Sequence, residues 1–113
     1  DMTLDETLQV DPYRLPRHVI PTRYEIRLEP DLTTSTFTGQ VTISLTVYQT
    51  TRTIILNAVD LVIDTAEVDR QGGGRIKASI DIDTSLQRAT LAFQELIPQG
   101  TGHLHLSLNG KLN

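Results

Sequence analysis

Residues 23–29 change character at every position, and this alternation constrains the fold more than any other feature of the sequence. Charged and apolar side chains follow one another in the order Arg23, Tyr24, Glu25, Ile26, Arg27, Leu28 and Glu29. Because successive side chains of a β-strand point to opposite faces, the segment predicts a strand with one apolar face and one wet face. The same period of two recurs along most of the chain and indicates an all-β fold.

The alternation predicts seven strands and no helix. They lie near residues 22–29, 36–48, 53–57, 61–68, 76–82, 89–94 and 103–108. Turns are expected where glycine, proline, aspartate and serine gather, at residues 31–35, 72–74, 83–85 and 98–102. Short strands at regular spacing predict a single antiparallel β-sandwich, or a strongly curved antiparallel sheet, of about seven or more strands.

The apolar positions of these strands predict the core. The residues expected to be buried at its centre are Ile43, Leu45, Leu91, Phe93 and Leu106. Tyr24 and Phe37 are also expected to be buried, and the apolar triplets 54–56 and 61–63 suggest segments covered on both faces. The second strand is unusually long, so Gly39 is the expected position of a bulge or kink.

Length and composition narrow the functional classes. The chain has 113 residues, which suits one domain, and its lack of cysteine excludes disulfides, a thiolate nucleophile and a cysteine-based zinc site. Ten basic against fourteen acidic residues, a net charge of −4, argue against nucleic acid as a partner. No apolar run approaches the roughly 20 residues that cross a bilayer. We therefore expect no membrane partner, and with no secretory signal at the start we expect a cytoplasmic location.

Two groups of side chains invite a chemical interpretation. His103 and His105 would share one face of a strand and could contact a divalent metal. Zinc needs a third ligand, which nothing nearby in the sequence supplies, although an aspartate or glutamate of another strand could. The favoured interpretation is two polar residues on a wet face. The charged stripe of residues 23–29 could bind a charged partner, but it is expected to face solvent and to form cross-strand ion pairs.

The remaining motifs give weaker evidence of a functional site. Asp81, Asp83 and Glu67 lack the glycine and distal glutamate of a calcium loop, and the two aspartates are better explained as turn residues. The glycines at residues 72–74 are not followed by the Lys-Ser/Thr of a phosphate-binding loop. No catalytic, cofactor-binding or metal-binding residue is assigned to this chain.

Several segments, in order, resemble the start of zinc aminopeptidases of the M1 (gluzincin) family, most closely the aminopeptidase N and puromycin-sensitive branch. The resemblance runs from residue 13 to residue 113, and its blocks are residues 13–16, 19–26, 28–32, 37–41, 55–61, 88–93, 96–100 and 108–113. One departure is Asn57, where the family usually has histidine. Residues 1–12 are acidic and sparsely apolar, so they are expected to form a flexible N-terminal arm.

The resemblance implies that residues 13–113 form the non-catalytic N-terminal β-domain of a metalloaminopeptidase that removes N-terminal amino acids from peptides. It implies that this domain is a saddle-shaped curved sheet, mostly antiparallel. It implies a catalytic domain in the same parent chain as the partner, with the peptide substrate bound through the parent. The family's zinc ligands lie in a His-Glu-x-x-His helix and a later glutamate, and neither motif occurs here. Zinc is therefore expected in the missing catalytic domain and no cofactor in this chain.

Two alternatives remain open. The chain could be a free-standing β-sandwich that binds a peptide or a carbohydrate, with Tyr48 as the one plausible aromatic platform on its surface. It could instead belong to an inactive M1-like interaction scaffold whose catalytic motif has decayed.

Overall fold

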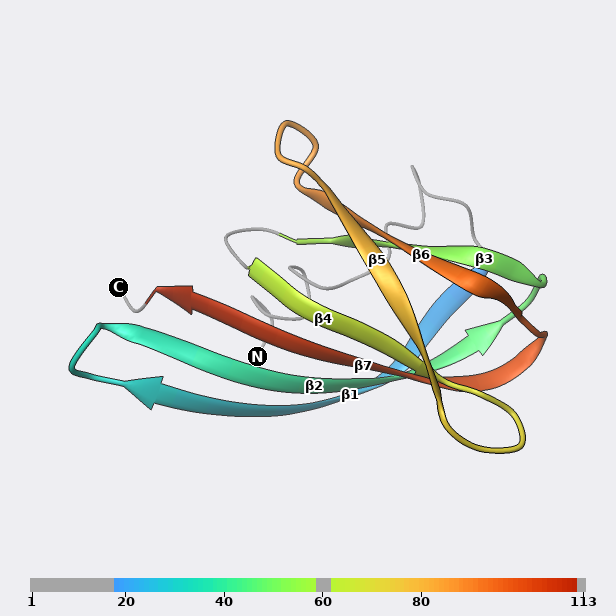
Figure 1. The fold of residues 1–113 in the computed structure, drawn as a ribbon, viewed down its shortest axis with the longest axis horizontal. Helices are drawn as coiled ribbons and strands as arrows, with labels where there is room; N and C mark the ends of the chain where they lie inside the picture. The colour runs from blue at the N-terminus through green and yellow to red at the C-terminus, as the bar shows by residue number, and fades with distance from the viewer. Residues whose placement is uncertain (1–17, 59–61, 112–113) are drawn as a thin grey trace.

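The computed structural model describes residues 18–58 and 62–111, so the expected arm at residues 1–12 lies outside it. The strands in the described residues are β1 (Val19–Asp31), β2 (Thr36–Val47), β3 (Thr51–Asn57), β4 (Val62–Asp69), β5 (Arg75–Asp83), β6 (Arg88–Ile97) and β7 (Gly100–Lys111). Neighbouring strands are antiparallel, in the order β1-β2-β7-β4-β5-β6-β3 (Figure 1). The predicted all-β class and strand number are confirmed. No helix in the described part of the chain is long and apolar enough to span a bilayer.

The sheet curls into a half-barrel because β5 changes partner along its length. Its first residues pair with β4, through Arg75↔Asp69 to Lys77↔Glu67. From Ala78 onward it pairs with β6 instead. Strands β5, β6 and β3 therefore fold over the sheet formed by β1, β2, β7 and β4 (Figure 1).

The core lies between these two layers, on the faces that the period of two marks as apolar. All five residues predicted at its centre are at most 4% exposed: Ile43, Leu45, Leu91, Phe93 and Leu106. Tyr24 and Phe37 are only half-buried. The expectation that both triplets are covered on two faces was wrong for the second, because Val62 is 57% exposed.

The predicted bulge at Gly39 was also wrong. The register passes through Gly39 without a shift on both sides, and the irregularity falls in β1 between Pro21 and Arg23. Gly39 instead allows a close approach, since a Cβ there would lie 3.0 Å from Leu28 Cδ2.

The turns follow their chemistry, with one correction. Asp31 Oδ1 accepts hydrogen bonds from the backbone N–H groups of Thr33 and Thr34. The three glycines at residues 72–74 have φ values of +87°, +119° and +77°, which only glycine adopts easily. The loop expected at residues 98–102 is shorter, because β7 already begins at Gly100.

Candidate functional site

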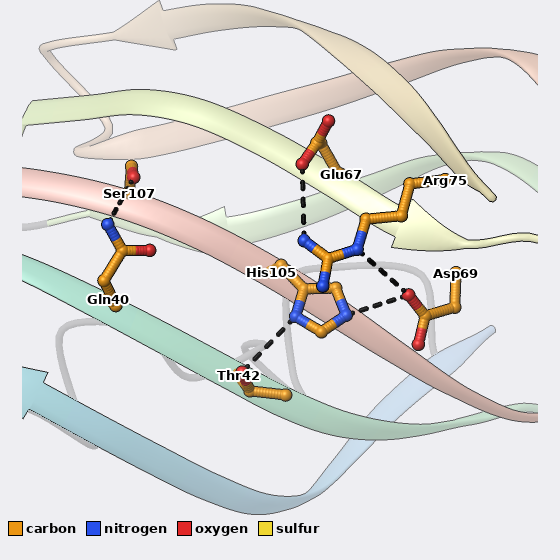
Figure 2. Close-up of polar contacts among 7 residues, drawn as sticks. All are labelled: Gln40, Thr42, Glu67, Asp69, Arg75, His105 and Ser107. Atoms are coloured by element: carbon orange, nitrogen blue, oxygen red, sulfur yellow. Dashed lines mark hydrogen bonds and ion pairs between the residues drawn. The ribbon is translucent and has the colours of Figure 1, made fainter.

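The richest polar cluster lies on the outer face of the sheet, opposite the core, where β2, β7, β4 and β5 run side by side (Figure 2). The register places Thr42 and Glu67 directly opposite His105 on either side. His105 Nε2 lies 2.9 Å from Asp69 Oδ1, and its Nδ1 lies 3.3 Å from Thr42 Oγ1. When Nε2–H donates to the carboxylate, the neutral ring can accept the threonine hydroxyl at Nδ1. Both ring nitrogens are thus engaged.

Both carboxylates of this cluster form ion pairs with one arginine. Arg75 Nε lies 3.4 Å from Asp69 Oδ1, and Arg75 Nη1 lies 3.5 Å from Glu67 Oε1 (Figure 2). His103 approaches the other oxygen of Asp69 at 3.9 Å. The structure therefore brings the two predicted histidines to one carboxylate, on the same face as expected.

This arrangement does not fit zinc. Among the described residues no group of three or more histidine, cysteine, aspartate or glutamate side chains could hold a metal ion. Arg75 Nε and His105 Nε2 both contact Asp69 Oδ1, and both nitrogens of His105 already have partners. The cluster can order the sheet surface, and nothing in its geometry supplies a nucleophile or a Lewis acid.

Sequence reasoning missed the partners of this cluster. Asp69 and Arg75 flank the glycine turn at residues 72–74, so the turn itself predicts that they face each other across a hairpin. Their meeting with His105 could not be foreseen, because it depends on β7 lying beside β4, which is set by the strand order.

The charged stripe of β1 differs from its prediction. Opposite its arginines and glutamates, β2 presents the uncharged residues Ser44, Thr42, Gln40 and Thr38. The ion pair seen on this strand joins Arg23 Nε to Glu25 Oε1 at 3.6 Å, along the strand rather than across it. The expected cross-strand ion pairs to the neighbouring strand were therefore wrong.

The acidic residues considered for calcium have separate roles. Asp83 Oδ1 accepts hydrogen bonds from Ser85 Oγ at 2.7 Å and from the Leu86 backbone N–H at 3.0 Å, which confirms the predicted turn chemistry for Asp83. These bonds hold the pKa of Asp83 below its ordinary value of 3.8. The same turn prediction was wrong for Asp81, which lies within β5 opposite Thr90. Glu67 lies instead on β4 and pairs with Arg75.

A shallow cavity of about 370 Å³ opens where β5 leaves β4 for β6. Its charged side chains include Arg70, which donates from Nε to Glu95 Oε1 at 3.2 Å. The hydrogen bond and charge of Arg70 lower the pKa of Glu95, and Glu95 raises that of Arg70. Arg70 and Glu95 thus form an ion pair at one wall of the cavity.

An apolar rim remains at the end of the β1–β2 hairpin. We use this name for Ile26, Leu28, Leu32 and Phe37. Leu28 is 51% exposed and Leu32 is 83% exposed, whereas residues farther along the same face of β2 are buried. Figure 1 shows the hairpin reaching beyond β3, β5 and β6, so these strands do not cover it. The rim therefore leaves apolar side chains exposed at this end of the sheet.

Comparison with known proteins identifies the family of this chain. Residues 20–113 match the peptidase M1 N-terminal domain. The chain belongs to this family. Aminopeptidase M1 of Arabidopsis thaliana is 40% identical over 104 residues, and Aminopeptidase M1-C of Oryza sativa subsp. japonica is 40% identical over 100 residues. Each alignment covers 88% of this chain but only 12% and 11% of the respective relative.

A solved structure shows the same fold. The M1 zinc metallopeptidase from Deinococcus radiodurans matches with a TM-score of 0.63 and 18% sequence identity. The match covers 85% of this chain and 21% of that protein. This M1 N-terminal domain chain thus spans only a small part of the proteins it resembles, and residues 18–58 and 62–111 hold no group of side chains that could bind zinc.

Proposed function

We propose that residues 13–113 form the non-catalytic N-terminal domain of a zinc-dependent aminopeptidase, which removes N-terminal amino acids from peptides. The observation that carries the proposal is the family match over residues 20–113, together with 40% identity to Aminopeptidase M1 of Arabidopsis thaliana. The outer-face cluster is consistent with a non-catalytic role, because its histidines and carboxylates contact one another and Arg75.

In this proposal the domain acts by packing against the catalytic domain of the same parent chain. The apolar rim is the surface that would be covered, since burying exposed leucine side chains is favourable by about 25 cal/mol per Å². Zinc and the groups that bind the peptide substrate would belong to the catalytic domain. The cytoplasmic location expected from the sequence stays a prediction.

The first test concerns the chain alone. The purified 113-residue chain, incubated with zinc, is expected to show no hydrolysis of aminoacyl amides above the buffer rate. The assay follows release of a chromogenic amine, with metal content measured on the same sample. Turnover that rises in proportion to bound zinc would contradict the proposal.

The second test concerns the rim in the longer protein that carries this chain. Leu28→Asp places a charge on the proposed contact and is expected to lower aminopeptidase activity and the melting temperature together. Leu86→Asp is the matched control, because Leu86 is 53% exposed in the β5–β6 turn, away from the rim. Equal effects of the two changes would overturn the docking surface. A longer protein with no aminopeptidase activity would overturn the function.

The surface gives the carbohydrate- or peptide-binding alternative little support. Such modules present several exposed aromatic side chains, and within residues 18–58 and 62–111 the exposed one is Tyr48, at 60%. Phe93 is buried, and Tyr24 and Phe37 are half-buried.

A further inference from the structure

Strand β1 forms one edge of the half-barrel. It ends the strand order, and among the described residues it forms strand pairs with β2 alone. An edge strand presents unpaired backbone N–H and C=O groups along its outer side, and these groups can pair with another strand. This edge is long, because β1 has 13 residues.

The charges on this edge are not matched inside the sheet. Across β1 the register supplies only uncharged residues of β2, and the ion pair of Arg23 with Glu25 is loose and highly exposed, with side chains 72% and 61% accessible. The stripe from Arg23 to Glu29 alternates in sign at every second residue. Such a stripe can be matched by a strand that carries the same order of charges in the opposite direction.

We propose that β1 pairs antiparallel with β1 of a second copy of this chain, about a two-fold axis at Ile26. In that register Arg23 lies opposite Glu29 of the second copy. Glu25 likewise lies opposite Arg27, and the two-fold axis repeats both pairs. Every charge of the stripe then faces an opposite charge across the new strand pair.

The same register joins the apolar faces of the two strands. Ile26 faces its own copy, and Tyr24 lies opposite Leu28 of the second copy. Tyr24 and Ile26 are half-buried and Leu28 is half-exposed, so each strand brings apolar surface that the pairing would cover further. A two-fold contact of this kind uses one self-complementary patch and closes at two copies.

The charges also reject the neighbouring registers. A slip by two residues in either direction sets arginine against arginine and glutamate against glutamate. A slip by one residue sets the charged face of one strand against the apolar face of the other. The charges therefore reject the registers within two residues of the proposed one, and the proposed register is the one that matches all four charges of the stripe.

Prolines bound the pairing segment without interrupting it. Pro21 and Pro30 lack a backbone N–H and commonly keep edge strands apart. Both lie outside residues 23–29, and so does the register shift between Pro21 and Arg23. The seven residues between them can supply a regular ladder.

The test is a charge exchange on the 113-residue chain, read by sedimentation equilibrium up to about 1 mM, because small interfaces associate weakly. Glu25→Arg alone sets arginine opposite arginine, and Arg27→Glu alone sets glutamate opposite glutamate. Each is expected to weaken self-association at least about tenfold, because two attractive contacts per dimer become repulsive. The double variant Glu25→Arg/Arg27→Glu restores opposite charges and is expected to associate like the unaltered chain.

An equimolar mixture of the two single variants supplies an internal control for folding. Each variant alone is expected to stay monomeric, while the mixture forms a heterodimer in which every pair is again opposite in sign. Misfolded variants could not give this result. An unaltered chain that stays monomeric would overturn the proposal, and so would single variants that associate normally. It is equally overturned by a double variant or a mixture that fails to associate. The test reads self-association of the 113-residue chain, in which Ile26 and Leu28 of the apolar rim are open to a second copy. Its outcome is therefore separate from the aminopeptidase assignment, which rests on the family match and is tested by activity.

Discussion

The ring of Phe37 lies against Gly110 of the neighbouring strand, and the two residues are directly paired between β2 and β7. A Cβ built at Gly110 would fall 2.6 Å from Phe37 Cζ, closer than two carbon atoms can approach. The half-buried ring therefore occupies the space that a side chain at residue 110 would need. Glycine is needed at residue 110 because of this close packing, and its backbone is not in the left-handed region.

Gly110→Ala is expected to destabilise the domain by about 1–3 kcal/mol, because overpacking forces the ring or the strand to shift. Gly102→Ala is the matched control on the same strand, since a Cβ there meets nothing within 4 Å. Urea unfolding measures both. In a Phe37→Ala background the cost of Gly110→Ala should largely disappear, and an unchanged cost would show that the ring is not its cause.

Predictions of buried residues from the sequence were correct where the apolar face of a strand is fully covered by the second layer. Ile43, Leu91 and Leu106 follow the period of two and are buried. The pattern could not tell that Phe37 and Leu28, on the same faces, would be partly exposed, because cover depends on how far the second layer extends. It also could not anticipate the partners of His105, which come from strands distant in sequence.

The β5–β6 hairpin shows how an element is held by its turn. Asp83 closes the turn through the Ser85 hydroxyl and the Leu86 backbone N–H, and Gln87 adopts a left-handed φ of +54°. The carboxylate form accepts these bonds better than the protonated form, first of all the bond from Ser85, so the pKa of Asp83 is lowered.

Because the pKa of Asp83 is lower in the folded state, the direction in which pH changes its contribution to stability is defined. The stabilisation is fully present above the ordinary value of 3.8 and is lost as the pH falls through the lower folded value. Asp83→Asn is therefore expected to lower the free energy of unfolding at neutral pH, and the difference from the unaltered chain should shrink below pH 3.8. Urea unfolding between neutral pH and strong acid measures it.

Asp81→Asn, two residues earlier on the same strand, is the control for the loss of a carboxylate within β5, where Asp81 lies opposite Thr90. A difference for Asp83→Asn that grows toward acid would contradict a lowered pKa in the folded chain.

Strands were easier to predict than their ends. Alternation located all seven strands that the structure describes, because each has one face in the core. The start of β7 at Gly100 was missed, since glycines and threonine at residues 100–102 are typical of a loop while the backbone already pairs with β2. The irregularity predicted at Gly39 lies at Pro21 instead, where the ring removes a donor from the ladder.

At the level of the whole molecule, strand order departs strongly from chain order. The last strand, β7, lies between β2 and β4, and β3 pairs with β6 at the far edge. Alternation along a sequence says which face of a strand is buried and nothing about its neighbours. The pattern therefore left a β-sandwich and a curved sheet open, the family resemblance implied a saddle shape, and neither predicted the strand order.

Pairing between distant segments makes folding slow, because the entropy of closing long loops must be lost before contacts form. We expect refolding of the 113-residue chain in about milliseconds to seconds, as in other domains dominated by non-local strand pairs. Stopped-flow dilution from denaturant measures the rate. Relaxation in microseconds would show that local hairpins dominate the barrier.

The central place of β7 has a consequence for synthesis. Until residues 100–111 are available, the β1–β2 hairpin has no strand pairing with β4, β5, β6 or β3. A nascent chain therefore carries two sets of paired strands that only β7 joins. Ribosome-bound chains stalled before Gly100 should remain protease-sensitive throughout, and resistance should arrive in one step once Lys111 has cleared the exit tunnel.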